Sequence, residues 1–261
     1  MTEYEAIVLE SSGPIARITL NRPDAANAMN DTMLRELADA ARRCDHGAAR
    51  VVVLTGAGRF FSAGGDLRAM ASSASTPGHY VKTMADDLHR AISTFARMDA
   101  VLITVVNGIA AGAGFSLAVT GDLVLAAESA SFTMAYTAAG LSPDGSSSFY
   151  LPRLIGVRKT QELMLTNRTL SADEALAWGL VTELANSADL AARAEALAEK
   201  IASGAKQSAS GVKKLVLMSF DNGLEEQMEL EGRLISACAD SPDGIEGINA
   251  FLEKRRPQFA R

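Results

Sequence analysis

The stretch VLITVVNGIAAGAGFSLAVTGDLVLAA, residues 101–127, decides the expected fold. It includes most of a run of 22 uncharged residues, 100–121, which is long enough to cross a membrane. Polar residues and four glycines interrupt this run, and no aromatic belt or basic flank accompanies it. We therefore expect buried elements of an α/β core: a strand at 101–106, a loop at 107–114 and a short helix at 115–121.

Strands and helices alternate on both sides of this stretch. Alternating apolar residues and turn residues predict strands at 5–10, 15–20, 50–55, 122–127, 129–135 and 181–184. Apolar residues at steps of three and four, together with capping residues such as Asp31, predict helices at 31–45, 79–97, 146–154, 157–166 and 171–178. From residue 189 onward the chain is mostly helical. The pattern predicts an α/β core over residues 1–185 and an all-helical region over 186–261.

The composition excludes several classes of function. With 261 residues, 48% of them hydrophobic and 21% charged, the chain can bury a large core as one domain or one domain with an appendage. The net charge of −6 gives no basic field for nucleic acid or an anionic membrane. Aromatic residues make up only 5%, which disfavours a stacking platform for single-stranded nucleic acid. We expect neither nucleic acid nor a membrane as a partner.

Metal and thiol chemistry are not expected either. Cys44 and Cys238 form no CxxC motif, and the chain has only three histidines. Cys44 and His46 are the one close pair, too few ligands for a zinc site. The opening residues MTEYEAIVLE lack the apolar segment of a secretory signal, so we expect a cytoplasmic protein.

Two glycine-rich loops carry the strongest chemical signal. GAGRFFSAGGDL (56–67) follows one expected strand, and NGIAAGAGF (107–115) follows another. Neither has the third glycine of a dinucleotide-binding motif, and the chain contains no P-loop or GxSxG motif. Small residues let the backbone approach a ligand closely, so the loops could supply two N–H donors to one oxyanion. Two close-packed turns without a ligand remain the alternative.

Three ordered segments make the chain recognisable. They are FFSAGGDL (60–67), VNGIAAGAGFSLAVTGDLVLAAESASF (106–132) and ELMLTNRTLSADEALAWGLV (162–181). Together they resemble the crotonase, or enoyl-CoA hydratase/isomerase, superfamily, and the resemblance covers nearly the whole chain. It implies a spiral of ββα units, a C-terminal helical region that forms homotrimers, commonly paired as hexamers, and acyl-CoA thioester substrates. No permanently bound cofactor is expected, because CoA is part of the substrate.

The resemblance also implies oxyanion donors and substrate-binding positions. The donors would be the backbone N–H groups of Gly65 and Ala113, each worth about 2.7–4 kcal/mol in the transition state. Residues 68–84 are expected to line the acyl pocket. The expected substrate-binding residues are Arg22, Ala25, Ala63, Asp66, Leu67, Tyr136, Phe251 and Lys254. For Phe251 the alternative is a core residue, and for Lys254 a solvated charge.

The chain departs from the family at two catalytic positions. The best-known hydratases use two glutamates to position and transfer a water, whereas the matching residues here are Ser116 and Tyr136. This speaks against the two-acid mechanism, because syn addition of water needs a general base and a general acid near one water. The remaining carboxylate is Asp144. Several family members carry their working carboxylate there, among them the ring-epoxide isomerase of phenylacetyl-CoA catabolism; a helix N-cap is the alternative.

One carboxylate suits a proton shuttle. The oxyanion hole acidifies a proton conjugated with the thioester, Asp144 removes it from one carbon, and the same acid returns it to another. We therefore expect enoyl-CoA double-bond isomerisation with Asp144, Gly65 and Ala113 as catalytic residues, and hydratase activity stays open.

The resemblance to the chlorobenzoyl-CoA dehalogenase gives a second interpretation. Its nucleophilic aspartate matches Asp144, and its assisting histidine matches His89, which is otherwise a surface histidine on an amphipathic helix. Its active-site aromatic residues match Tyr136 and Gly65, which disfavours an aryl halide. The alternatives are therefore an aryl- or acyl-CoA hydrolase or dehalogenase with Asp144 as nucleophile, and a non-catalytic CoA-binding paralogue.

Overall fold

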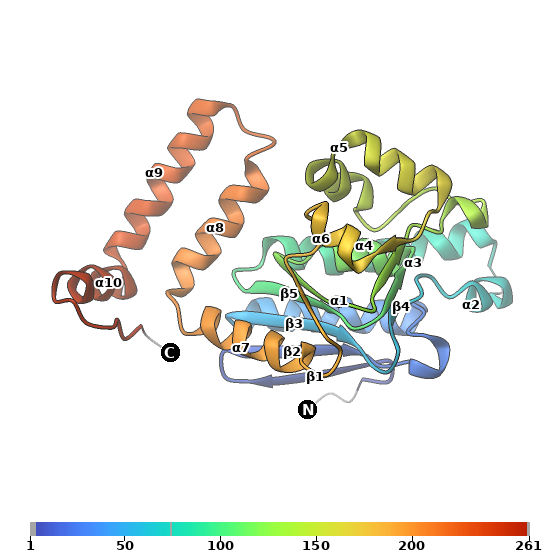
Figure 1. The fold of residues 1–261 in the computed structure, drawn as a ribbon, viewed down its shortest axis with the longest axis horizontal. Helices are drawn as coiled ribbons and strands as arrows, with labels where there is room; N and C mark the ends of the chain where they lie inside the picture. Colours follow the sequence, from blue (N-terminus) through green and yellow to red (C-terminus); the bar gives the residue numbers. More distant parts are fainter. Residues whose placement is uncertain (1–3, 74, 260–261) are drawn as a thin grey trace.

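The computed structural model describes residues 4–73 and 75–259, and it has a mixed α/β fold built on two sheets (Figure 1). In the larger sheet the strand order is β1 (Ile7–Ser12), β2 (Ile15–Leu20), β3 (Val51–Gly56), β5 (Val101–Val106), β7 (Leu123–Ala127) and β10 (Glu183–Ala185). The hairpin β1–β2 is antiparallel, and all later pairs are parallel. The smaller sheet has the order β4 (Phe60–Ser62), β6 (Ile109–Ala111), β8 (Ser131–Thr133) and β9 (Leu170–Ser171).

Helices fill the connections between strands and make up the C-terminal quarter. The α-helices are α1 (Asp31–His46), α2 (Leu67–Ser72), α3 (Pro77–Arg97), α4 (Ala113–Ala118), α5 (Ser147–Thr166), α6 (Ala172–Ala177), α7 (Leu190–Ala202), α8 (Lys206–Met218), α9 (Leu224–Asp240) and α10 (Pro242–Leu252). Two short 3-10 helices, η1 (Pro23–Ala25) and η2 (Thr137–Ala139), lie in loops.

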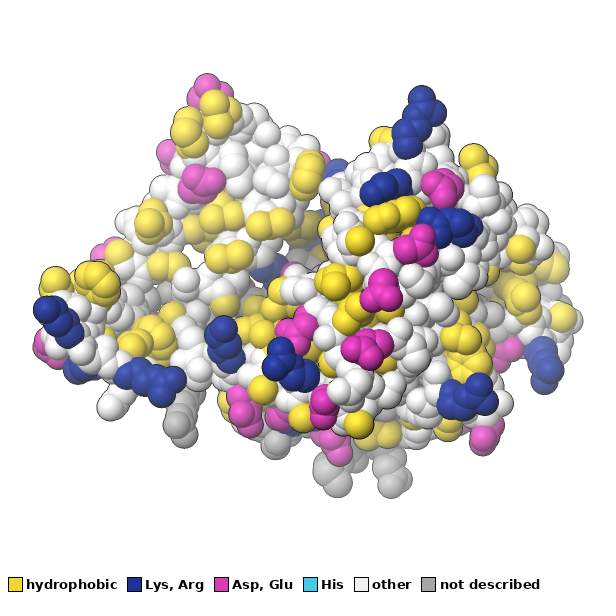
Figure 2. All heavy atoms as spheres, viewed as in Figure 1, with side chains coloured by type: hydrophobic (Ala, Val, Ile, Leu, Met, Phe, Trp, Pro, Cys, Tyr) yellow, Lys and Arg dark blue, Asp and Glu magenta, His cyan; other side chains and the backbone are white. Residues whose placement is uncertain are grey.

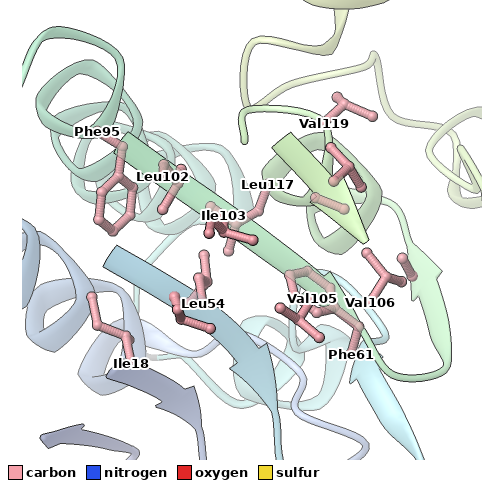
Figure 3. Packing of buried hydrophobic residues seen from close by; sticks show 14 of the residues in the cluster. Ile18, Leu54, Phe61, Phe95, Leu102, Ile103, Val105, Val106, Leu117 and Val119 are labelled. Atoms are coloured by element: carbon pink, nitrogen blue, oxygen red, sulfur yellow. The ribbon is translucent and has the colours of Figure 1, made fainter. Parts of the chain in front are cut away.

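The uncharged run is divided among a strand, a connecting segment and a helix, as expected, but the connection contains the short strand β6, in which Ile109 is exposed. Every residue of β5 is buried, β6 follows it, and α4 begins at Ala113. Apolar side chains from β2, β3, β5 and α4 meet in the centre of the molecule, where Ile18, Leu54, Leu102 and Leu117 are fully buried (Figure 3). Among the described residues, no helix has the length and apolar character needed to cross a bilayer.

Local sequence accounts for most element ends, with some corrections. The cap of α1 is Asn30, whose side chain accepts a hydrogen bond from the Met33 amide, and not Asp31 as expected. The two helices expected at 146–154 and 157–166 are joined as α5, with a break at Gly156, where φ is 79° and ψ is 160°. The very short strands β4, β6 and β9 were not predicted, because two- and three-residue strands leave no periodicity to detect.

Contact with the core decreases from one C-terminal helix to the next. The expected boundary between residues 185 and 186 falls between β10 and α7, yet α7 still packs on β3 and β5. Helix α8 is anchored by Lys213, whose ammonium donates to the Phe95 and Ala100 carbonyl oxygens and pairs with Asp122 at 2.8 Å. Helix α9 packs on α8, and α10 on α9, so these helices form an arm beside the core (Figure 1).

The arm exposes many apolar side chains. No described residue of α9 is buried, and α10 buries only Ala250. The surface view shows apolar side chains along this arm (Figure 2). Those exposed by more than half are Val212, Val216, Phe220, Leu224, Met228, Ile235, Ile245, Ile248, Phe251 and Leu252.

Candidate active site

The two glycine-rich loops touch each other, and this contact forms the base of the site. Gly64 has φ of +92°, a conformation that disfavours any side chain. A Cβ placed on it would lie 2.7 Å from the Ala111 carbonyl oxygen and 3.2 Å from the Ala113 nitrogen. Gly112 also has a positive φ of 50° and directs the chain into α4. The loop after β4 and the turn before α4 therefore pack backbone against backbone.

Two amides at this contact have no acceptor among the described residues: those of Gly65 and Ala113. The surrounding amides are occupied, with Gly64 donating to Ser62 Oγ, Asp66 to the Met29 carbonyl and Gly112 to the Thr133 carbonyl. Ala113 is the first residue of α4, where helix geometry leaves N–H groups without a partner. Both amides line one cavity, so they are available to a ligand oxygen.

The cavity has a volume of about 450 Å³ and is mostly apolar. Its floor includes Gly65 and Ala113, and Asp144 is the only Asp or Glu among its described lining residues. One wall comes from the expected segment 68–84, with Met70, Pro77, Gly78, Val81, Lys82 and Met84. The opposite wall comes from Ala135, Tyr136, Ala139, Leu141, Ser142 and Pro143. An apolar cleft with a few convergent polar groups is typical of a small-molecule site.

Asp144 and His89 meet at the edge of this cavity. His89 Nε2 lies 2.7 Å from Asp144 Oδ1, although the residues are 55 positions apart. The His89 side chain is half exposed, at 50%, and that of Asp144 is 36% exposed. His89 stands on α3. The contact joins the two residues that match the nucleophilic aspartate and the assisting histidine of the dehalogenase. Asp144 Oδ2 has no protein partner among the described residues.

The Asp144 main chain is held by hydroxyl groups. Its carbonyl oxygen is contacted by Ser116 Oγ at 2.8 Å, Ser147 Oγ at 3.0 Å and Tyr136 Oη at 3.1 Å. Burial raises the pKa of the Tyr136 hydroxyl above its ordinary value, so this group remains a donor. The N-cap alternative for Asp144 is wrong: the cap position of α5 is Ser146, and the Asp144 carboxylate bonds to His89 instead.

The other expected substrate-binding residues of the core lie on the loop after β4 and on the neighbouring loop at η1. Ala63 and Leu67 line the cavity. Asp66 does not line it: its side chain caps α2 and forms an ion pair with Arg22 at 2.9 Å. Ala25 ends η1, in the loop that Arg22 begins. Backbone bonds join this loop to the oxyanion loop, because the Ala63 amide donates to the Ala26 carbonyl and the Met29 amide to the Gly64 carbonyl.

Phe251 and Lys254 are not part of this arrangement within one chain. Neither lines the cavity, and α10 lies at the opposite end of the molecule from α2 and α3 (Figure 1). Phe251 is 83% exposed, so the core alternative for this residue is wrong. Their contact with a substrate stays a prediction.

The comparisons with known proteins agree with this geometry. The family model described as enoyl-CoA hydratase/isomerase matches residues 10–261. The chain belongs to the enoyl-CoA hydratase/isomerase family. A protein of Rhodobacter capsulatus named probable enoyl-CoA hydratase is 38% identical over 257 residues, covering 98% of each chain. The 1,2-epoxyphenylacetyl-CoA isomerase of Escherichia coli is 36% identical over 250 residues, covering 94% of each.

A solved structure supports the fold. Enoyl-CoA hydratase subunit I of Geobacillus kaustophilus superimposes with a TM-score of 0.91 at 32% identity, covering 99% of each chain. The expected crotonase fold is therefore confirmed, and the chain is an acyl-CoA enzyme of the hydratase/isomerase type. In the part of the chain that the structure describes, no three His, Cys, Asp or Glu side chains lie close enough to share a metal ion.

Sequence reasoning missed one part of the site. Ser147 was not singled out, and Ser116 was noted only because it is not a glutamate. Their shared role at the Asp144 carbonyl depends on side chains from α4 and α5, which no local pattern brings together. The only available signal was the run of serines after Asp144.

Proposed function

We propose that this chain isomerises the double bond of an enoyl-CoA, with Asp144 as the proton shuttle. The observation that carries the proposal is that Asp144 is the one carboxylate among the described residues of a cavity whose wall also presents the Gly65 and Ala113 amides. The two donors would bind the thioester oxygen and stabilise the enolate that forms on deprotonation. The positions of the hydratase glutamates hold Ser116 and Tyr136, which cannot act as carboxylate bases.

The reaction balances with one acid–base group. Asp144 takes a proton from the α carbon of a β,γ-enoyl thioester, and the electron pair moves into a dienolate whose oxygen accepts the two N–H bonds. The protonated Asp144 then returns a proton to the γ carbon, which leaves the α,β-enoyl product and the original carboxylate. Asp144 Oδ1 contacts His89, so we assign the proton transfer to Oδ2, which has no protein partner among the described residues. No resident cofactor takes part, since CoA arrives with the substrate.

A substrate screen tests the proposal. Straight-chain, branched and aryl enoyl-CoA thioesters are incubated with the wild type and Asp144→Asn, in H₂O and in D₂O. We expect wild-type isomerisation with deuterium at the α or γ carbon, and a loss of about 10²–10⁴-fold in Asp144→Asn. Hydration of the same substrates is measured in parallel by the hydroxyacyl product. Unchanged turnover in Asp144→Asn contradicts the shuttle, and CoA binding without any turnover would favour the non-catalytic paralogue.

The contact between His89 and Asp144 favours a second candidate, attack by Asp144 on an aryl- or acyl-CoA. In this scheme Asp144 displaces halide from a haloaryl-CoA to form an aryl ester, or displaces the CoA thiolate from an acyl-CoA to form a mixed anhydride. His89, at 2.7 Å, is placed to assist the water that hydrolyses this intermediate and restores the Asp144 carboxylate. Tyr136 is the only aromatic side chain among the described lining residues, which weakens the case for an aryl ring. A haloaryl-CoA added to the enzyme, followed by mass spectrometry of the peptide that holds Asp144, separates the two schemes. An ester adduct supports the nucleophile, and its absence with deuterium exchange supports the shuttle.

We further propose that the arm of α8, α9 and α10 assembles the chain into a homotrimer, alone or as a pair of trimers. The exposed apolar side chains of the arm support this, because such a surface is costly in water. Assembly would also let Phe251 and Lys254 approach the cavity of another copy. Light scattering after size-exclusion chromatography measures the mass directly. We expect three or six chains for the wild type and smaller species for Ile235→Asp; a monomeric wild type contradicts the proposal.

A further inference from the structure

The Asp144 carbonyl is an unusual point of convergence. Three hydroxyls, from Ser116, Tyr136 and Ser147, lie within 2.8–3.1 Å of this one oxygen. Ser116 Oγ also lies 3.0 Å from Tyr136 Oη, so these two can bond to each other. A carbonyl has two lone pairs, which Ser116 and Ser147 can fill while Tyr136 donates to Ser116. Every proton of the three hydroxyls then has an acceptor.

The hydroxyls come from three segments that are separate in the sequence. Ser116 belongs to α4, Tyr136 immediately precedes η2, and Ser147 begins α5. Ser116 and Ser147 are fully buried, so neither can exchange its partner for water. Removing one of these hydroxyls leaves the Asp144 carbonyl oxygen with its other donors, which include the Ser147 amide at 3.5 Å, but takes away a contact that fixes the position of this oxygen.

The backbone directly after Asp144 has an unfavourable conformation that the surrounding contacts must hold in place. Gly145 and Ser146 both have positive φ, at 63° and 66°. For Ser146 this left-handed conformation is strained, and strain persists only where the surroundings enforce it. Gly145 also packs closely on α4, because a Cβ placed on it would lie 2.9 Å from Ser116 Cβ. The network and this contact together fix the direction in which Asp144 leaves the backbone.

Ser116 links this support to the oxyanion hole. It stands one helical turn after Ala113 in α4, and its amide donates to the Gly112 carbonyl at 3.0 Å. One short helix therefore carries both an oxyanion donor and an anchor of the carboxylate. The separation between the thioester oxygen and the proton being moved depends on that helix, and a misplacement of about 1 Å can cost 10²-fold in rate.

We propose that Ser116, Tyr136 and Ser147 are positioning residues that hold Asp144 through its main-chain carbonyl at a fixed distance from the Ala113 donor. This inference rests on the proposed function, in which Asp144 touches the substrate. Ser116 and Tyr136, which stand at the two glutamate positions of the hydratases, thus help to position Asp144. Their hydroxyl groups act through Asp144, and Tyr136 in addition lines the cavity.

A double-mutant cycle tests this role. Ser116→Ala and Tyr136→Phe each remove one hydroxyl and are made in the wild type and in Asp144→Asn, with kcat and KM measured on the best substrate of the screen. We expect kcat to fall about 10–100-fold in each single variant, with KM within about threefold. In the Asp144→Asn background the same changes should cost less than about twofold, because the group that they position is already absent.

Thr104→Val is the matched control. Thr104 Oγ1 is also buried and donates to the Ala118 carbonyl of α4, but it does not contact Asp144 or the cavity. We expect this variant to lower the melting temperature as Ser116→Ala does and to keep kcat within about threefold. Equal kcat losses in the control and in Ser116→Ala, or full additivity with Asp144→Asn, overturn the inference. Wild-type turnover in Asp144→Asn overturns the proposed function, and the inference with it.

Discussion

Ala113→Pro deletes a proposed oxyanion donor without deleting a structural hydrogen bond. A side-chain change normally leaves the backbone N–H in place, but proline has none. Ala113 is the first residue of α4, the helical position that proline tolerates best, and its amide has no acceptor among the described residues. We therefore expect stability to change by less than about 1 kcal/mol, a shift of about 2–4 °C in melting temperature.

The expected effect on catalysis is much larger. If the Gly65 and Ala113 amides on the cavity wall are the two oxyanion donors, as proposed, the loss of one should raise the barrier by about 2.7–4 kcal/mol, or about 10²–10³-fold in kcat. The proline ring also enters the space where the thioester oxygen would lie, so this figure is a lower bound. Ala113→Gly keeps the N–H and serves as the control, with kcat expected within a few-fold of the wild type.

Two assays distinguish the outcomes. The first is kcat on the best substrate for the wild type, Ala113→Pro and Ala113→Gly, with melting curves of all three. The second needs no knowledge of the substrate: a 3-ketoacyl-CoA is added, and the absorbance of its enolate reports polarisation by the two donors. A folded Ala113→Pro protein that retains turnover within about tenfold and polarises the ligand fully would show that the Ala113 amide is not a donor.

Three further changes test other parts of the structure. Gly64→Ala should destabilise by about 2–5 kcal/mol, because it combines left-handed strain with a clash against the Ala111 carbonyl at 2.7 Å, and denaturant unfolding measures this. Lys213→Met should cost about 1–3 kcal/mol, because it removes the buried ammonium that donates to the Phe95 and Ala100 carbonyls and pairs with Asp122, and denaturant unfolding measures this as well. Hydrogen bonding from Tyr4 lowers the pKa of Asp39 to about 2, so the carboxylate stabilises the fold above its ordinary pKa of 3.8 and loses this effect as the pH falls towards 2. Asp39→Asn should therefore cost roughly 0.5–1 kcal/mol at pH 7 and almost nothing near pH 2, as read by unfolding at each pH.

The architecture was predictable where local pattern and burial agree. The uncharged run could be assigned to a buried strand, a loop and a helix because its glycines and polar residues argue against a membrane span. The hairpin β1–β2 was predictable from the turn residues between two apolar segments, and the capping box from the spacing of Ser171 and Glu174. The cap of α1 was placed one residue late, because Asn30 and Asp31 are both good capping residues and only geometry decides between them.

The site was only partly predictable, for a physical reason. The donors lie on loops whose glycines are visible in sequence, but the contact of Gly64 with Ala113 joins segments about fifty residues apart. The His89–Asp144 contact and the hydroxyls on the Asp144 carbonyl have the same character. Such contacts depend on how α3, α4 and α5 pack, and no periodicity within one element encodes that packing. The family resemblance predicted which residues belong to the site, and the structure gives the distances and hydrogen bonds between them.

The use of main-chain amides also limits which point mutations can remove them. An alanine codon becomes a proline codon when its first base alone changes, whereas a glycine codon must change its first and second bases together. Of the two donors, only that of Ala113 can therefore be lost by a single point mutation. Every other single-base change that replaces one amino acid by another at either position leaves the N–H in the chain, so such substitutions reshape the pocket around these amides far more easily than they remove them.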